Sequence, residues 1–289
     1  MIKAPINFGV FILVSGSKNT GPGLSKAQEA VMHKNDLSDS KFNITKLIPP
    51  LSILCGLGLW ELAVRLGNYP AFILPSPSRI AQRFVSASRT GLLWPHVWVT
   101  FSEVLAGLLI GTAAALIAGY FLAHSPVAEK IIFPYVVVSQ AVPLAAIAPL
   151  LIIWFGSGIR PKIVICALTV FFPLLINILV GYRELEKNLN DLFISMKAGR
   201  WSRLVYLEFP GILPVLLGGL RISATLSVIG AVVGELSGAD AGLGYLINIG
   251  RGQYDTALVF VALIMLMLIA LVLYGTVLLL ERRLLKWNK

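Results

Sequence analysis

The segment NDLFISMKAGRWSRLVYLEFPGILPVLLGGLRI, residues 190–222, changes character near its midpoint. Its first half mixes charged side chains such as Asp191 and Arg200 with apolar ones, whereas the residues after Pro210 are almost all apolar. About 20 apolar residues cross the hydrocarbon core of a membrane as a helix. The second half therefore predicts the start of a membrane span, and the charged half predicts a helical element outside the membrane interior.

The composition of the whole chain is typical of an integral membrane protein. Of 289 residues, 57% are hydrophobic and 13% are charged, and the mean hydropathy is +0.82. Soluble domains are about 25% charged, and one with this much apolar surface would aggregate. The net charge of +10 comes from Lys and Arg in short segments between apolar runs, which indicates membrane orientation rather than nucleic-acid binding.

Six apolar segments are long enough to cross a membrane. Each must pair its backbone polar groups internally, so the helix is the expected conformation and the predicted fold is an all-α polytopic membrane protein. The six predicted spans are Leu47–Leu66, His96–Ala123, Ile131–Phe155, Lys162–Tyr182, Ile212–Leu236 and Ala257–Leu280.

The distribution of Lys and Arg predicts that both termini are cytoplasmic. In that orientation the inner segments carry 16 of these residues and the outer segments carry 7, in agreement with the positive-inside rule. Residues 17–40 are polar, and residues 1–45 predict a mostly flexible cytoplasmic tail before a membrane domain over 46–289, with a short surface-lying segment at Ile6–Val14 as the alternative. Residues 76–89 predict an amphipathic helix on the outer surface, capped by Ser76 or Ser78.

The inner loop 187–211 contains the charged half of the opening segment. Asn190 or Asp191 can cap a helix there, and Gly199 can turn the chain between two short helices. Pro210 is expected to end the second helix before the next span. A helix lying on lipid would have a similar composition, but it would not need so defined an end. A helical hairpin that docks a soluble partner is therefore favoured.

This loop resembles the coupling loop of ABC-importer permeases. That family carries Glu-Ala-Ala, then a Gly six residues after the Glu, and later Ile-x-Leu-Pro. Both alanines and the glycine are replaced in this chain, and Gly199 lies two positions after the family's glycine. Aligned on the proline, the motif falls on Asp191, Leu192, Phe193, Lys197 and the stretch Leu207–Pro210.

Four further motifs occur in the family's order between residues 47 and 285. They resemble the permeases of nitrate, sulfonate, taurine and thiamine-precursor importers. The motifs are LPSPSRIAQRF (74–84), AVPLAAIAPLLIIWFGSG (141–158), LPVLLGGLRISATLSVIGAVVGEL (213–236) and GLGYLI (242–247).

The resemblance implies a permease of the bacterial inner membrane with a cytoplasmic coupling helix. Its implied partners are a second copy in a homodimer, ABC ATPase subunits at the cytoplasmic face and a substrate-binding protein at the outer face. It implies no cofactor in this chain, because ATP and Mg would be bound by the partner ATPase. In agreement, the sequence has no GxxxxGK[ST] segment.

Two groups of candidate site residues follow. The residues implied for ATPase coupling are Asp191, Leu192, Phe193, Ser195, Met196, Lys197, Gly199, Arg200, Trp201 and Pro210. Polar residues inside spans are costly in lipid and are candidates for the translocation path. These are Ser139 and Gln140, together with Pro143, which can free backbone carbonyls, and Glu235. The alternatives are a simple kink at Pro143, and for Glu235 an outer-surface carboxylate or a pairing role with Arg251.

Small residues recur every four positions in the second predicted span, at Gly107, Gly111, Ala115 and Gly119. Such a stripe lets two helices approach closely, and packing within the chain is favoured over a dimer seam.

Other functions remain open at this point. An ATP-independent facilitator or channel is the main alternative, but it would not need the hairpin and would usually show an internal repeat. A membrane enzyme needs an activated nucleophile or metal ligands, and the three histidines are far apart in the sequence. The resemblance implies a small organic solute, which we expect to be a thiamine precursor or other pyrimidine, a riboflavin-like molecule, or a sulfonate such as taurine.

Overall fold

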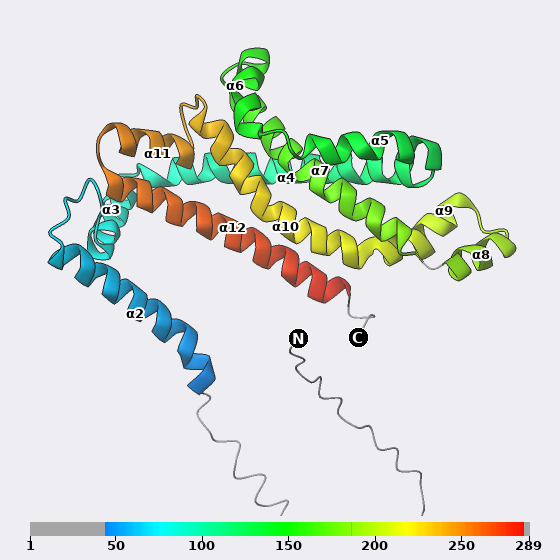
Figure 1. The fold of residues 1–289 in the computed structure, drawn as a ribbon, viewed down its shortest axis with the longest axis horizontal. Helices are drawn as coiled ribbons and strands as arrows, with labels where there is room; N and C mark the ends of the chain where they lie inside the picture. Colours follow the sequence, from blue (N-terminus) through cyan, green and yellow to red (C-terminus); the bar gives the residue numbers. More distant parts are fainter. Residues whose placement is uncertain (1–43, 186, 286–289) are drawn as a thin grey trace, which may run out of the picture. The chain divides into compact units, whose positions relative to one another are not determined.

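The computed structural model describes residues 44–185 and 187–285, and Figure 1 shows the helices that they form. Within these ranges the chain contains helices and no strand, so the predicted all-α fold is confirmed. The chain divides into two compact units, residues 1–56 and 57–289, and each is described by itself. The predicted tail lies outside the described residues except for its last two.

The first unit contributes the beginning of α2 (Ile44–Leu66), and the second unit contains the other helices. Five described helices are long and apolar enough to cross a membrane, or six if one bent pair counts as a span. The helices after α2 are α3 (Pro77–Arg89), α4 (Leu93–Ala123), α5 (Pro126–Ser139), α6 (Leu144–Phe155), α7 (Ile159–Arg183), α8 (Lys187–Ser195), α9 (Arg200–Arg203), the π-helix η1 (Leu204–Glu208), α10 (Phe209–Leu236), α11 (Leu243–Gly252) and α12 (Thr256–Leu284).

The predicted third span, Ile131–Phe155, is not one continuous helix. It is divided into α5 and α6, which meet at an angle of 98°. Pro143 precedes α6 with an extended ψ of 106°, and a proline has no N–H to continue the helical hydrogen bonds. The turn over residues 140–143 is therefore sharper than the kink that the sequence suggested.

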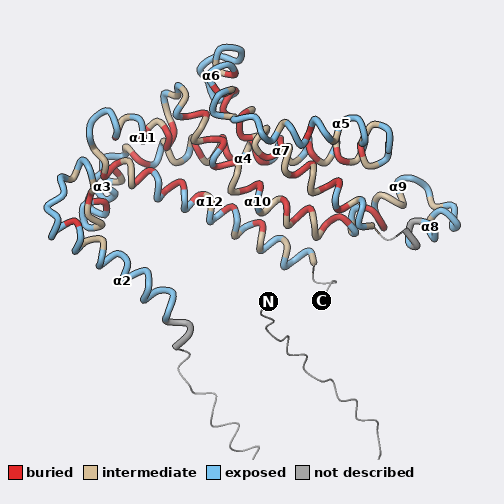
Figure 2. The backbone as a smooth tube through the Cα atoms, viewed as in Figure 1, coloured by how far each residue is buried: buried red, intermediate tan, exposed pale blue. Residues whose placement is uncertain are grey.

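The core of the second unit is formed by α4, α7 and α10, whose facing sides are buried in Figure 2. Gly107 of α4 lies against Cys166 of α7, and Gly119 lies against Ile178, so closely that a Cβ on either glycine would overlap its neighbour. The predicted stripe of small residues therefore packs within the chain. Close approach of this kind maximises van der Waals contact between helices that cannot rely on water exclusion.

Polar contacts fix α3 and α12 to the rest of the unit. The Ser76 hydroxyl accepts a hydrogen bond from the backbone N–H of Arg79 and caps α3, which confirms one of the two predicted caps. Asp255 caps α12 and also accepts a hydrogen bond from Arg83 of α3 at 2.6 Å. Along α12, Glu281 forms an ion pair with Arg221 of α10.

Candidate functional site

The charged segment forms an exposed hairpin, which we define as α8, α9 and the turn between them (residues 187–203; Figure 1). Three large apolar side chains on it are exposed: Leu192 by 52%, Met196 by 70% and Trp201 by 76%. Asp191 and Arg200 are exposed beside them. An exposed aromatic and a methionine next to charges are typical of a surface that binds another protein.

The local structure of the hairpin differs from the prediction at two points. Because α8 begins at Lys187, Asn190 and Asp191 lie inside the helix and do not cap it. Gly199 lies between the two helices as predicted, but its φ of −65° is ordinary. The left-handed residue in the turn is Lys197, with φ of +52°. Lys197 is the position aligned with the family's glycine, and glycine adopts this conformation without steric cost.

Pro210 does not end the helix, contrary to the prediction. The helical path runs from Arg200 through η1 to Leu236, and Pro210 is the second residue of α10. A proline ring crowds the carbonyl four residues earlier, which here belongs to Tyr206 in η1. In a π-helix, each carbonyl accepts a hydrogen bond from the N–H five residues later, rather than four as in an α-helix. This wider turn allows the helix to pass the proline unbroken.

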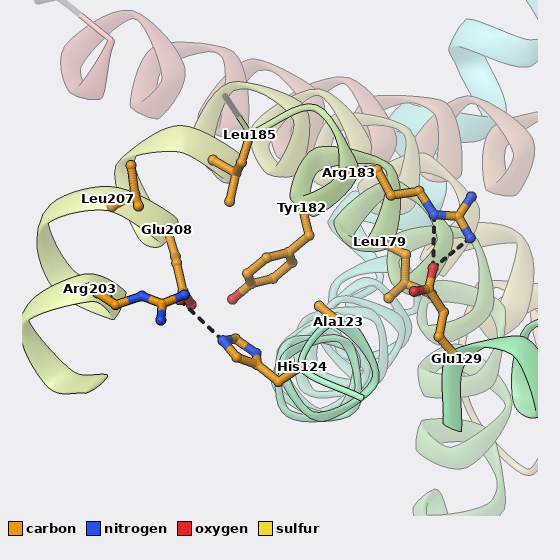
Figure 3. A pocket seen from close by; sticks show the side chains of 10 residues that line it. All are labelled: Ala123, His124, Glu129, Leu179, Tyr182, Arg183, Leu185, Arg203, Leu207 and Glu208. Carbon is orange, nitrogen blue, oxygen red and sulfur yellow. Dashed lines mark hydrogen bonds and ion pairs between the residues drawn. The ribbon is translucent and has the colours of Figure 1, made fainter. Parts of the chain in front are cut away.

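A pocket of about 400 Å³ lies at the base of the hairpin, where the ends of α4 and α7 meet η1 (Figure 3). Its lining combines apolar side chains with several charged ones, and the ring of Tyr182 points toward Glu208 and His124. The lining residues are Ala123, His124, Glu129, Leu179, Tyr182, Arg183, Leu185, Arg203, Leu207 and Glu208.

The charged residues of the pocket lie in two groups on opposite sides of Tyr182 (Figure 3). On one side, Arg183 of α7 donates two hydrogen bonds to Glu129 of α5, at 2.8 and 2.5 Å. On the other side, Nε2 of His124 lies 3.1 Å from Oε1 of Glu208, and Arg203 lies 3.9 Å from the same oxygen. The contact between His124 and Glu208 links the end of α4 to the π-helix that carries the hairpin.

Three of the predicted path residues lie together at the turn between α5 and α6. Gln140 and Pro143 are exposed there, and the Ser139 hydroxyl donates to the carbonyl of Tyr135 at 2.7 Å. An exposed glutamine is a group that a polar solute could contact, whereas the carbonyls of Ser139 and Pro143 accept hydrogen bonds within the chain. Their assignment to a path remains a prediction.

Glu235, the fourth predicted path residue, lies in a buried cluster. Its side chain has no exposed surface, so the alternative of an outer-surface carboxylate is wrong. Its carboxylate accepts hydrogen bonds from the Thr100 hydroxyl at 2.6 Å and from the Gly244 N–H at 2.5 Å. Arg251, considered as its partner, is exposed instead.

The same cluster contains residues that the sequence reasoning missed. Lys162 of α7 forms an ion pair with Glu103 of α4 at 3.2 Å, and both are buried. The backbone N–H of Gly242 donates to His96, and that of Leu243 donates to Thr100. These side chains bind the first N–H groups of α11. A charged Glu103 within a predicted span was the signal that could have identified the cluster.

Five or six apolar helices in the described residues are long enough to cross a membrane, and the match to a transport family makes the chain an integral-membrane transport subunit. Residues 107–286 match the family described as the inner membrane component of binding-protein-dependent transport systems, which is more than half of the chain. The chain belongs to this family of ABC-importer permeases.

Curated relatives extend the match over most of the chain. The chain is 46% identical over 239 residues to the riboflavin transport system permease protein RibX of Chloroflexus aurantiacus, covering 83% of this chain and 89% of that protein. It is 32% identical over 243 residues to the formylaminopyrimidine transport permease protein ThiX of Halalkalibacterium halodurans, covering 84% and 96%. Among solved structures, an inward-facing MetNI methionine ABC transporter chain matches with a TM-score of 0.59 and 18% identity, covering 68% and 98%. That last likeness concerns the fold alone.

Proposed function

We propose that this protein is the permease subunit of an ATP-driven importer, which passes a small organic solute from an outer binding protein into the cytoplasm. The family match supports the transport role. The observation that carries the ATP-driven part is the exposed hairpin, whose apolar and charged side chains lie outside the core of the second unit. A facilitator that needs no energy source would have no use for this surface.

The hairpin is the proposed contact with the ATPase subunits. The chain itself is proposed to bind no cofactor, since ATP and Mg belong to those partners. In this proposal, movement of the ATPase subunits pushes Leu192, Met196 and Trp201, and the helices behind them change between inward-open and outward-open states. The hairpin end and both termini are then cytoplasmic, the membrane is a bacterial inner membrane, and two copies of the permease enclose the path.

The opposite end of the second unit is the proposed docking face for the binding protein. A groove there is lined by residues of α3 and of the segment after α11, including Arg79, Gln82 and Tyr254. Arg79, Arg89 and Arg251 are exposed at this end. Positive charge is unusual on the outer side of a membrane protein. It would attract a binding protein with an acidic surface and speed their encounter.

The proposed solute is a small molecule with a pyrimidine ring, alone or fused into a flavin. The relatives named for riboflavin and for formylaminopyrimidine are 46% and 32% identical to this chain, and both of those solutes contain such a ring. Permeases named for aliphatic sulfonates are also similar, at 31% and 32% identity, and they make sulfonates the second candidate.

The test is uptake into proteoliposomes that contain the permease, its ATPase and the binding protein of the same organism. Uptake of labelled riboflavin and of formylaminopyrimidine is measured with and without ATP, with taurine as the sulfonate control. The double variant Asp191→Arg/Met196→Arg should abolish uptake and lose the ATPase on purification. Asp240→Arg/Gln253→Arg adds the same charge at exposed positions away from the hairpin and should keep the ATPase bound.

Three outcomes would contradict the proposal. Uptake that does not depend on ATP would favour a facilitator. Full uptake by the Asp191→Arg/Met196→Arg variant would remove the hairpin from coupling. Uptake of taurine alone would replace the pyrimidine class by sulfonates.

A further inference from the structure

An apolar groove of about 410 Å³ lies between α3, α12 and the part of α2 that belongs to the second unit. Its lining is apolar throughout and includes Leu57 and Trp60 of α2, Phe84 of α3, and Ile264 and Leu268 of α12. Leu57, Phe84 and Leu268 are exposed by 42%, 36% and 43%, so the groove is open to its surroundings. Figure 1 shows α3 beside the first half of α12, where the groove lies.

The surroundings of this groove are the hydrocarbon of the membrane. Both α12 and residues Ile48–Leu66 of α2 are long and apolar enough to cross it. The exposed sides of such helices meet lipid acyl chains instead of water. An acyl chain in the groove touches three helices, so it gains more van der Waals contact than a chain lying against one helix. The shape of the groove therefore suits an acyl chain.

The groove leads directly into a polar pocket along α3. Ala81 and Val85 line both hollows, and the pocket adds Gln82, Ser86 and Arg89 to its lining. Apolar side chains and hydrogen-bond donors thus follow one another along a single amphipathic helix. A phospholipid has its parts in the same order, because its acyl chains lead to a glycerol and then to a phosphate. The two hollows together match one lipid molecule better than they match a purely apolar ligand.

The charge of α3 favours a phosphate at the polar end. The helix carries three arginines and no acidic residue. Arg83 is paired with Asp255, whereas Arg89 is exposed and forms no ion pair with any residue that the structure describes. A guanidinium presents its N–H donors as a fork that matches phosphate oxygens. Arg89 is therefore a free cation at the point where the apolar groove gives way to polar side chains.

A second groove provides a comparison within the same molecule. It has a volume of about 350 Å³, lies between α4 and α7, and is lined by apolar side chains such as Ala114, Ile163 and Phe171. No charged or amide side chain contributes to its lining. Acyl chains can rest in this second groove, but it contains no group that would select one headgroup over another.

We propose that the groove between α2, α3 and α12 is a binding site for an anionic phospholipid, with one acyl chain against Trp60 and Phe84 and the phosphate at Arg89. In the proposed orientation this lipid belongs to the outer leaflet. The site is separate from the proposed transport function, because neither the solute nor the ATPase takes part in it. Arg79 lines the other groove of α3, with Tyr254, and stays available to the binding protein.

The experiment is native mass spectrometry of the purified full-length permease with added phosphatidylglycerol or phosphatidylcholine of identical acyl chains. The wild type should bind one phosphatidylglycerol per chain about fivefold more tightly than phosphatidylcholine, since one basic residue near an anionic headgroup contributes about this factor. Arg89→Gln should remove that preference. Arg251→Gln removes an exposed arginine that does not line the groove, and it should leave the preference unchanged.

Two variants test the acyl-chain part of the site. Ala81→Phe fills the groove from α3 and Leu268→Phe narrows it from α12, and both should lose the specific binding of either lipid. Ala114→Phe places the same ring in the second groove and should bind phosphatidylglycerol as the wild type does. Circular dichroism first confirms that each variant is folded, and two filling variants on different helices guard against the failure of one.

Three results would overturn the proposal. The first is equal binding of the two lipids by the wild type. The second is undiminished binding of phosphatidylglycerol by both Ala81→Phe and Leu268→Phe. The third is a change from dimer to monomer in these two variants with lipid binding intact, which would assign the groove to a second copy of the chain. None of these measurements involves transport, so failure here is distinct from failure of the proposed function.

Discussion

Replacing Glu235 by alanine should destabilise the permease far more than replacing it by glutamine. The carboxylate accepts hydrogen bonds from Thr100 and from the Gly244 N–H, and its side chain has no exposed surface. Alanine would leave both donors buried without an acceptor. Each such loss costs about 1–3 kcal/mol, and the cavity left by the missing atoms adds to it.

Part of that loss is offset, because Glu235 is close to the second buried carboxylate of Glu103, and Lys162 is the one cation that the described residues place beside the two. A net destabilisation of about 3 kcal/mol is therefore expected for Glu235→Ala. Glutamine keeps the shape and one strong acceptor, and its amide can donate to Glu103. We expect Glu235→Gln to cost about 1 kcal/mol or less.

The chain contains a reporter for this measurement. Cys166 is buried between α4 and α7, and Cys55 is exposed. In a Cys55→Ser background, a thiol-reactive fluorophore will label the protein only when the helices separate. Heating should then give a midpoint lowered by about 6–12 °C for Glu235→Ala. Equal midpoints for Glu235→Ala and the parent, or equal losses for alanine and glutamine, would refute the assignment of Glu235 as the acceptor that holds α11.

Three further predictions follow, two of them measured by the same thermal assay and the one at Lys197 by amide exchange. Gly111→Leu should prevent folding or lower the midpoint strongly, since a Cβ at Gly111 already meets α7, whereas Gly275→Leu in α12 has open space and should be tolerated. Lys197→Gly should stabilise the hairpin turn by about 1 kcal/mol, because a lysine in the left-handed conformation is strained. Amide exchange in residues 195–200 should then slow, and faster exchange would contradict the prediction. Asp255→Ala should cost more than Arg83→Ala, by about 1 kcal/mol, because Asp255 caps α12 in addition to binding Arg83; equal costs would mean that the cap contributes nothing.

Sequence patterns predicted the apolar spans well, because the length of hydrocarbon to be crossed leaves little freedom. The start of α3 and the packing of the Gly107–Gly119 stripe were also predicted. A serine before a helix indicates a cap, and small residues repeated every four positions indicate close packing of two helices. The same reasoning placed the charged hairpin and its two helices close to where the structure has them.

Two of the errors share a cause, since Pro143 and Pro210 were judged by local rules alone. Pro210 was expected to end a helix, but the wider turn of the π-helix before it makes room for the proline ring, and the helix continues. Pro143 was expected to loosen or kink a helix, and the two helices on either side of it meet at 98°. Which outcome occurs depends on neighbouring helices that a local pattern does not contain. Glu103 and Lys162 were missed for a similar reason, because they are 59 positions apart and meet only in the folded chain.

The buried cluster around Glu103, Lys162 and Glu235 limits how the core helices can move. These charged groups belong to α4, α7 and α10, and sliding one helix by a single turn would displace its group by about 5.4 Å. A buried charge separated from its partner costs several kcal/mol, whereas apolar neighbours could be exchanged at little cost. The cluster therefore locks the axial register of the three helices. A rearrangement that keeps these contacts must therefore move the three helices together as one body.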